Sequence, residues 1–276
     1  MQTHALAILG EADQLAIGAA QAEAAHVLGQ DADWAPRHDL PATGAADPVG
    51  LAAMIDHTIL RPSAQRDDIL RMCDEVAEYG FFGICVNPLW VATAAQRLSR
   101  TPAAVIAVIA FPLGATPTRD KQAEALAAVG DGATELDMVA SLGSLRSGDP
   151  VGYASDVEAV VSAAANVPVK VIIESGLLRD AYERAFASCL ATLAGAAYVK
   201  TSTGFAYDTS AELARPLGAA AADVAVMASA VGQSARVKAS GGIRSYQQAI
   251  EMIRAGASRI GTSSGPKIVA ERDLAS

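Results

Sequence analysis

The chain has 276 residues, 51% of them hydrophobic and 18% charged, which is typical of a globular protein with enough apolar residues for a large core. The formal net charge of −9 argues against a surface that binds nucleic acid or an anionic membrane. The three cysteines are far apart and form no Cys-x-x-Cys pair, which argues against a disulfide framework or a zinc site and predicts a reducing, cytoplasmic location.

The first 47 residues differ in composition from the rest of the chain. Residues 1 to about 30 are rich in alanine and place apolar residues at helical spacing, whereas residues 29–48 have the prolines, glycines and aspartates of a linker. The start lacks the basic segment of a signal peptide, and no apolar run is long enough to cross a bilayer. We therefore expect an N-terminal extension over 1–47, helical and partly mobile, before a single domain over 48–276.

From Val49 onward, short β-branched runs alternate with helical stretches. The eight expected strands are 54–59, 81–86, 105–111, 134–139, 169–174, 197–201, 236–240 and 258–262. The helical stretches between them begin with polar residues and end near a glycine, which are capping signals. This alternation predicts parallel βαβ units, and eight of them close into a (β/α)8 barrel, an α/β fold. An open doubly wound sheet is the alternative, although no G-x-G-x-x-G follows the first strand.

Three of the expected strands each carry a lysine directly after a valine. Lys170, Lys200 and Lys238 stand in otherwise apolar runs, where an unpaired ammonium group would be costly to bury. They belong to the fifth, sixth and seventh strands, which are neighbours in a barrel. Asp137 on the fourth strand and Asp56 on the first would point into the same interior region if the pleats agree.

Lysines crowded in this way favour one particular chemistry. Like charges and desolvation both disfavour the protonated amine, so one lysine could be uncharged near neutral pH. An uncharged amine attacks a carbonyl carbon and forms a Schiff base, while Lys238 could supply the second cation and Asp137 the proton transfer. The alternative is a set of structural ion pairs, such as Lys170 with Asp137. Three lysines on consecutive strands make that alternative the weaker one.

Glycine-rich turns follow the last three expected strands. They read STGF (202–205), SGGIR (240–244) and GTSSG (261–265). Glycine lets backbone N–H groups approach an anion, and a helix N-terminus adds favourable potential. Phosphate sites of barrels often follow the last two strands, so we expect an anion site here, with Ser263 and Ser264 as donors and Arg244 as a further charge.

These residues resemble the deoxyribose-phosphate aldolase family. The resemblance covers about 50–268 and rests on eight motifs in family order: IDHTILRP, FGICVNP, FPLGATPT, ELDMV, VKVIIESGLL, VKTSTGF, VKASGGIR and RIGTSSG. It implies that Lys200 is the Schiff-base lysine, Lys238 its activating partner and Asp137 the proton-transfer acid/base. Lys170 and Asp56 would be supporting polar residues. The phosphate would be held by Gly204, Gly241, Gly242, Ser263 and Ser264.

The resemblance also implies a reaction. Family members reversibly cleave 2-deoxyribose 5-phosphate to acetaldehyde and glyceraldehyde 3-phosphate, without metal or other cofactor. The partners would be sugar phosphates and aldehydes, with no nucleic acid or membrane, and we expect a homodimer. One departure lies after Phe205, where an enlarged loop over 205–219 replaces a glycine-rich run and would affect substrate access. The alternatives are an isomerase-type barrel and a non-catalytic barrel that binds a sugar phosphate.

Overall fold

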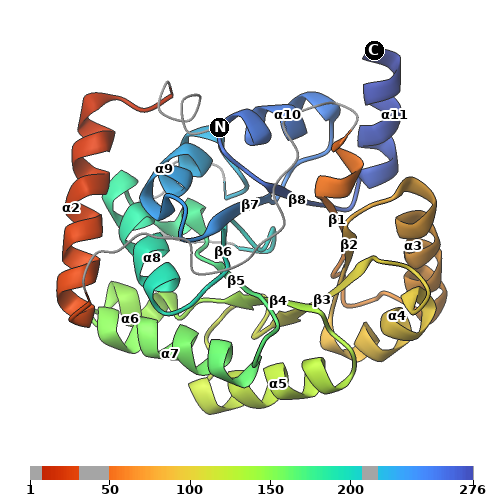
Figure 1. Ribbon diagram of the computed structural model, residues 1–276, viewed down its shortest axis with the longest axis horizontal. Helices are drawn as coiled ribbons and strands as arrows, with labels where there is room; N and C mark the ends of the chain where they lie inside the picture. The colour runs from red at the N-terminus through yellow and green to blue at the C-terminus, as the bar shows by residue number, and fades with distance from the viewer. Residues whose placement is uncertain (1–7, 31–49, 207–216, 276) are drawn as a thin grey trace.

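The protein is a closed (β/α)8 barrel, as a computed structural model shows for residues 8–30, 50–206 and 217–275 (Figure 1). All eight strands run parallel, and the last pairs with the first. The strands are β1 (Ile55–Ile59), β2 (Gly83–Val86), β3 (Ala104–Ile109), β4 (Glu135–Val139), β5 (Val169–Ile172), β6 (Tyr198–Lys200), β7 (Arg236–Ser240) and β8 (Arg259–Thr262). Each lies within two residues of its predicted bounds, and the open doubly wound sheet is wrong.

The helices surround the barrel and cover the outward face of the strands (Figure 1). They are α2 (Glu11–Leu28), α3 (Arg66–Tyr79), α4 (Val91–Leu98), α5 (Thr118–Gly130), α6 (Leu142–Arg146), α7 (Pro150–Ala163), α8 (Ala181–Leu193), α9 (Ala221–Val231), α10 (Tyr246–Arg254) and α11 (Gly265–Ala275), with short 3-10 turns η2 (Ala52–Met54), η3 (Pro88–Trp90) and η4 (Ser175–Leu177). None of the helices within these described residues is long and apolar enough to cross a membrane.

Capping residues set the ends of these helices. Asp68 in the first turn of α3 accepts a hydrogen bond from the Gln65 N–H at 3.0 Å, which satisfies a donor that the helix leaves free. At the other end Gly80 has a φ of 66°, a left-handed conformation that ends the helix. The polar start and the glycine end that the sequence predicted for this stretch are therefore the physical caps.

The interior of the barrel has an apolar half and a charged half. Register pairs Ile106 with Glu135 and Val108 with Asp137, so these four side chains share the inward face of β3 and β4. The apolar half is a buried cluster made of Leu60, Cys85, Ala104, Ile106 and Val108. From β4 round to β8 and β1, the inward positions include seven buried charged residues, namely Glu135, Asp137, Lys170, Lys200, Lys238, Arg259 and Asp56. Every one of these strands is buried on both faces, as parallel sheets usually are.

The N-terminal helix α2 lies along α8 and also touches α9 (Figure 1). Ala20 and Ala24 are fully buried there, because their small side chains let the two helices approach closely. Gln21 donates to the Ala230 carbonyl at 2.8 Å, and the Tyr182 hydroxyl donates to Glu23. The helical part of the expected extension is thus packed on the barrel. The boundary at 47/48 falls among residues 31–49, outside the described residues, and stays a prediction.

The packing of α2 predicts the effect of a charge at its buried face. Ala24→Glu should lower the free energy of unfolding by on the order of 2 kcal/mol, because a larger, charged side chain cannot be accommodated at a site with no exposed area. Leu15→Glu on the same helix is the matched control, since Leu15 is 70% exposed and its replacement should change stability by less than about 0.5 kcal/mol. Urea unfolding followed by circular dichroism measures both. Equal stability of the two variants would mean that α2 does not dock.

Candidate active site

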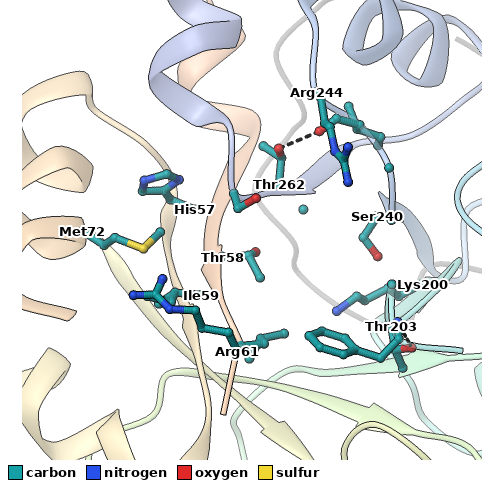
Figure 2. A pocket seen from close by; sticks show the side chains of 18 of the residues that line it. His57, Thr58, Ile59, Arg61, Met72, Lys200, Thr203, Ser240, Arg244 and Thr262 are labelled. Atoms are coloured by element: carbon teal, nitrogen blue, oxygen red, sulfur yellow. Dashed lines mark hydrogen bonds between the residues drawn. The ribbon is translucent and has the colours of Figure 1, made fainter. Parts of the chain in front are cut away.

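A cavity of about 480 Å³ opens at the carboxyl ends of the strands (Figure 2). Its walls come from the ends of β1, β6, β7 and β8, the loops that follow them, and helix α3. Strand carboxyl ends in a barrel all reach the same face, which is why segments nearly 200 residues apart line one cavity. Of the three strand lysines, Lys200 lines this cavity, whereas Lys170 and Lys238 have no exposed area.

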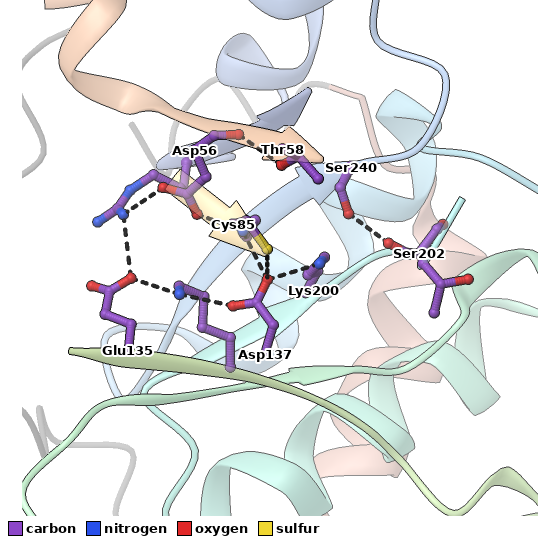
Figure 3. A network of polar contacts seen from close by, with 12 residues as sticks. Asp56, Thr58, Cys85, Glu135, Asp137, Lys200, Ser202 and Ser240 are labelled. Atoms are coloured by element: carbon purple, nitrogen blue, oxygen red, sulfur yellow. Dashed lines mark hydrogen bonds and ion pairs between the residues drawn. The ribbon is translucent and has the colours of Figure 1, made fainter. Parts of the chain in front are cut away.

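The three strand lysines meet at one carboxylate beneath the cavity (Figure 3). Oδ1 of Asp137 lies 2.8 Å from Nζ of Lys170, and Oδ2 lies 2.8 Å from Nζ of Lys200 and 2.8 Å from Nζ of Lys238. Burial alone would raise the pKa of Asp137, but the three ammonium groups outweigh it and hold the pKa well below its ordinary range. The predicted convergence of Lys170, Lys200, Lys238 and Asp137 is therefore what the structure shows.

Asp56 supports Lys238 from the first strand. Its Oδ2 lies 2.5 Å from Nζ of Lys238, so this ammonium group contacts two carboxylates. Burial by itself would lower the pKa of Lys238, yet the charges of Asp137 and Asp56 raise it above its ordinary value. Burial by itself would raise the pKa of Asp56, but the positive charges of Lys238 and Arg259 lower it below its ordinary value. Lys238 therefore holds its proton firmly.

Below these groups lies a second layer that our sequence reasoning missed. Arg259 donates from Nη1 to Oδ1 of Asp56 at 2.9 Å and from Nη2 to the Tyr198 hydroxyl at 3.2 Å. Glu135 lies 2.6 Å from Nζ of Lys170. Arg259 and Glu135 are almost completely buried. They carry the signal that singled out the lysines, a charge inside a buried strand, and the same criterion would have found them.

Four of the five residues predicted to hold an anion line the cavity. Gly204, Gly241, Gly242 and Ser263 all line it. Gly241 needs to be glycine, because its φ is 95° and an added Cβ would lie 3.2 Å from Cα of Gly218. The side chain of Ser263 is exposed to the cavity at the start of α11.

Ser264 does not line the cavity. Its N–H donates to Oγ1 of Thr262 at 2.9 Å, and its carbonyl accepts from Ile268 at 3.0 Å as helix α11 begins. The backbone donor of Ser264 is thus already engaged within the chain. Its predicted role in holding phosphate stays a prediction, to which the site geometry adds less support than it adds for Ser263.

Two further polar contacts support the walls of the cavity. Nε2 of His57 lies 2.6 Å from Glu75, and burial lowers the His57 pKa. Glu174 accepts hydrogen bonds from the Thr203 N–H and hydroxyl, and so holds the turn after β6. The predicted enlarged loop of 205–219 falls largely on residues 207–216, outside the described residues.

Cys85 is a fully buried residue of β2. Its Sγ lies 3.9 Å from Oδ2 of Asp137, and burial raises the pKa of the thiol to about 11. A thiol with such a pKa is protonated near neutral pH and is a poor nucleophile.

A barrel with a lysine at its cavity, a buried carboxylate in contact with that lysine and glycine turns in the cavity wall is of the class of (β/α)8 enzymes whose site lies at the carboxyl ends of the strands. Residues 51–271 match the family model described as DeoC/LacD family aldolase. The deoxyribose-phosphate aldolase of Thermococcus gammatolerans is 49% identical over 224 residues, covering 79% of this chain and 95% of its own. The chain therefore belongs to the DeoC/LacD family of aldolases.

Two further relatives agree with this assignment. The deoxyribose-phosphate aldolase of Rhodospirillum rubrum is 47% identical over 241 residues, covering 87% of this chain and 96% of its own. The solved structure of deoxyribose phosphate aldolase from Aeropyrum pernix, described as a unique tetramer, superposes with a TM-score of 0.75 at 33% identity. That superposition covers 84% of this chain and 94% of the Aeropyrum chain.

The shared carboxylate predicts how stability depends on pH. A carboxyl group whose pKa is depressed on folding stabilises the protein above its unfolded pKa, near 4, and loses that effect as the pH falls. Asp137→Asn should lower the free energy of unfolding by about 3–5 kcal/mol at pH 7, because three ammonium groups lose their common partner. The difference from wild type should shrink below about pH 4.

Urea unfolding at pH 7, 5 and 3.5 measures this difference. Asp131→Asn is the control, because Asp131 is exposed and its loss should change stability little at any of the three values. A deficit in Asp137→Asn that stays constant from pH 7 to 3.5 would contradict the depressed pKa.

Proposed function

We propose that the protein reversibly cleaves 2-deoxy-D-ribose 5-phosphate to acetaldehyde and D-glyceraldehyde 3-phosphate through a Schiff base on Lys200. The observation that carries this assignment is that Lys200 is the one of three clustered lysines that lines the cavity. Its relatives named deoxyribose-phosphate aldolase, nearly half identical over most of the chain, support the substrate.

The chemistry follows from an amine at this position. Nζ of Lys200 attacks the C1 aldehyde of the open-chain sugar, and loss of water gives a protonated imine. Removal of the C3 hydroxyl proton breaks the C2–C3 bond, and its electron pair moves into the imine to form an enamine. Glyceraldehyde 3-phosphate leaves, C2 takes up a proton, and water hydrolyses the imine. This hydrolysis releases acetaldehyde and regenerates the free amine, so no oxidant or reductant is needed.

Asp137 and Lys238 act on this amine from below. Oδ2 of Asp137 lies 2.8 Å from Nζ of Lys200, the nitrogen that loses and gains protons as the imine forms and is hydrolysed. We assign proton transfer at that nitrogen to Asp137. Asp137 does not line the cavity, so the proton of the C3 hydroxyl leaves through water or a cavity group. Lys238 supplies the fixed cation, with Lys170 and Asp56 in support.

The glycine turns give the substrate its orientation. Ser263, Gly241 and Gly242 line the same cavity as the amine, and α11 begins just after Ser263, where backbone N–H groups and the helix dipole favour an anion. We assign the 5-phosphate to this end, together with Gly204 and Ser264, so that C1 faces Lys200. An isomerase-type or a non-catalytic barrel is not favoured, because neither is named among the curated relatives reported above.

Assembly and location remain predictions for this chain. We expect a homodimer in the cytoplasm. The relative from Aeropyrum pernix is described as a tetramer, so self-association is a feature of at least one family member.

Replacement of the proposed nucleophile predicts loss of chemistry with retention of the fold. Lys200→Met should lower turnover by at least about 1,000-fold, because Lys200 is the one lysine among the described residues that line the cavity. Borohydride reduction in the presence of acetaldehyde should leave an ethyl adduct on Lys200 of the wild type, seen by peptide mass spectrometry. Lys267→Met on the exposed face of α11 is the control and should keep full activity. Wild-type turnover in Lys200→Met would rule out the assignment.

The anion site predicts selective loss on the phosphorylated substrate. Ser263→Glu places a negative charge where the dianion is expected, which should cost on the order of 1–3 kcal/mol, roughly 10- to 100-fold in kcat/KM for the phosphate ester. Cleavage of unphosphorylated 2-deoxyribose should change much less. Ser263→Gln has the same size without the charge and is the matched control. An equal loss of both substrates in Ser263→Glu would place the phosphate elsewhere.

A further inference from the structure

The buried charges beneath the cavity form a closed ring of alternating sign (Figure 3). We call this the charge ring, and its members in order are Arg259, Asp56, Lys238, Asp137, Lys170 and Glu135. The six successive contacts are 2.9, 2.5, 2.8, 2.8, 2.6 and 3.5 Å, the last returning from Glu135 to Arg259. Every cation in the ring touches two carboxylates, and every carboxylate touches two cations.

The charge ring is electrically balanced without Lys200. It holds three cations and three carboxylates, all almost completely buried. Lys200 is a seventh charge, attached only through Oδ2 of Asp137, which it shares with Lys238. Among the described residues no carboxylate pairs with Lys200 other than Asp137, so its proton would leave the cluster with one cation in excess.

Two other titratable groups lie near Lys200. Glu174 at the end of β5 interacts electrostatically with Lys200 but forms no ion pair with it, and its carboxylate instead accepts hydrogen bonds from the Thr203 N–H and hydroxyl. Cys85 on β2 carries a thiol whose pKa is raised to about 11, so it brings no negative charge near neutral pH. The amine therefore faces two ring ammonium groups and one carboxylate already shared between all three.

We propose that Arg259 and Glu135 are positioning residues of the aldolase reaction, because they close the charge ring and so make Lys200 the single amine that has no counter-charge of its own. The proposal rests on the function assigned above to Lys200. It adds two residues that touch neither cavity nor substrate, and it gives a reason why Lys200, rather than Lys170 or Lys238, is the uncharged nucleophile.

The chemistry of the ring members supports this division of roles. Burial alone would lower the pKa of Lys170, and that of Lys238, but the neighbouring carboxylates raise both. Arg259 carries a guanidinium that stays protonated in proteins, so the excess positive charge of the cluster cannot be removed by deprotonation of Arg259. Lys200 is the amine of the cluster that lies outside the ring.

Opposite changes to the ring should move the activity in opposite directions. Arg259→Met removes a cation, so the charge of protonated Lys200 would then be balanced by a carboxylate. The acidic limb of the pH profile of kcat/KM, where activity rises with pH, should therefore move to higher pH. Glu135→Gln removes a carboxylate, and the limb should move to lower pH. Each shift should be about one pH unit, the effect of a unit charge at about 10 Å in an effective dielectric near 20. The double variant restores the original excess of one cation and should return the limb to its wild-type position.

The experiment measures kcat/KM for 2-deoxyribose 5-phosphate from pH 5 to 9 in the wild type, both single variants and the double variant. The fraction of enzyme trapped by borohydride with acetaldehyde at each pH is a second readout that does not depend on the phosphate site. Arg259→Lys keeps the charge at the same strand position and should keep the wild-type limb. Circular dichroism confirms that each variant is folded.

The outcomes separate the proposal from a structural role and from a wrong function. Opposite shifts that cancel in the double variant support the charge ring. Limbs that do not move, or that move in the same direction, overturn it, even where turnover falls. If Arg259→Met does not fold, the test rests on the two other variants. The acidic limb of Glu135→Gln should then move to lower pH, and the limb of the double variant should stay at its wild-type position. Trapping of wild-type enzyme on Lys200 without these shifts would leave the aldolase assignment intact and reject the ring.

Discussion

The barrel interior depends on one carboxylate that is shared by three buried ammonium groups. An isolated charge in such surroundings would cost several kcal/mol, and removing one member of a buried pair is costlier than never having had the pair. Asp137 therefore requires Lys170, Lys200 and Lys238 to point inward together, which fixes the pleat phase of β4, β5, β6 and β7. A slip of one residue in any of these strands would turn a charge onto the helix-covered face. Apolar side chains of similar volume could stabilise the fold equally well, so the buried charges are better explained by a role in a reaction than by a role in stability.

The two halves of the interior work together at this site. The apolar cluster of β2 and β3 lies beside Asp137. Apolar surroundings have a low local dielectric, which strengthens the electrostatic interactions next to them. Glycine makes the charged half possible, since a Cβ at Gly261 would lie 3.0 Å from Cε of Lys238. The cluster meets the cavity at Lys200, so its fixed charges act on whatever group binds next to that amine.

Closure of the barrel joins the two ends of the chain around the substrate. Pairing of β1 with β8 brings Asp56 beside Gly261, so that a residue of the first strand can complete the partners of Lys238. The same closure brings Ser263, which precedes α11, and residues of α3 into the lining of one cavity, although these segments are distant in sequence. Lys200 is held by a rigid strand, and the glycine turns that line the cavity are anchored at strand ends, which is what orientation of a small substrate requires.

Much of this protein was readable from its sequence. The eight strands, the barrel, the inward lysines and Asp137 were all predicted, because strand periodicity and a charge inside an apolar run are local signals. Arg259 and Glu135 carried the same local signal and could have been found by it, but nothing local says which carboxylate a buried cation meets. The sharing of Asp137 among three lysines, the closed order of the ring and the single lysine at the cavity were decided by tertiary structure. They depend on register, strand tilt and closure of the barrel, which are properties of residues far apart in the chain.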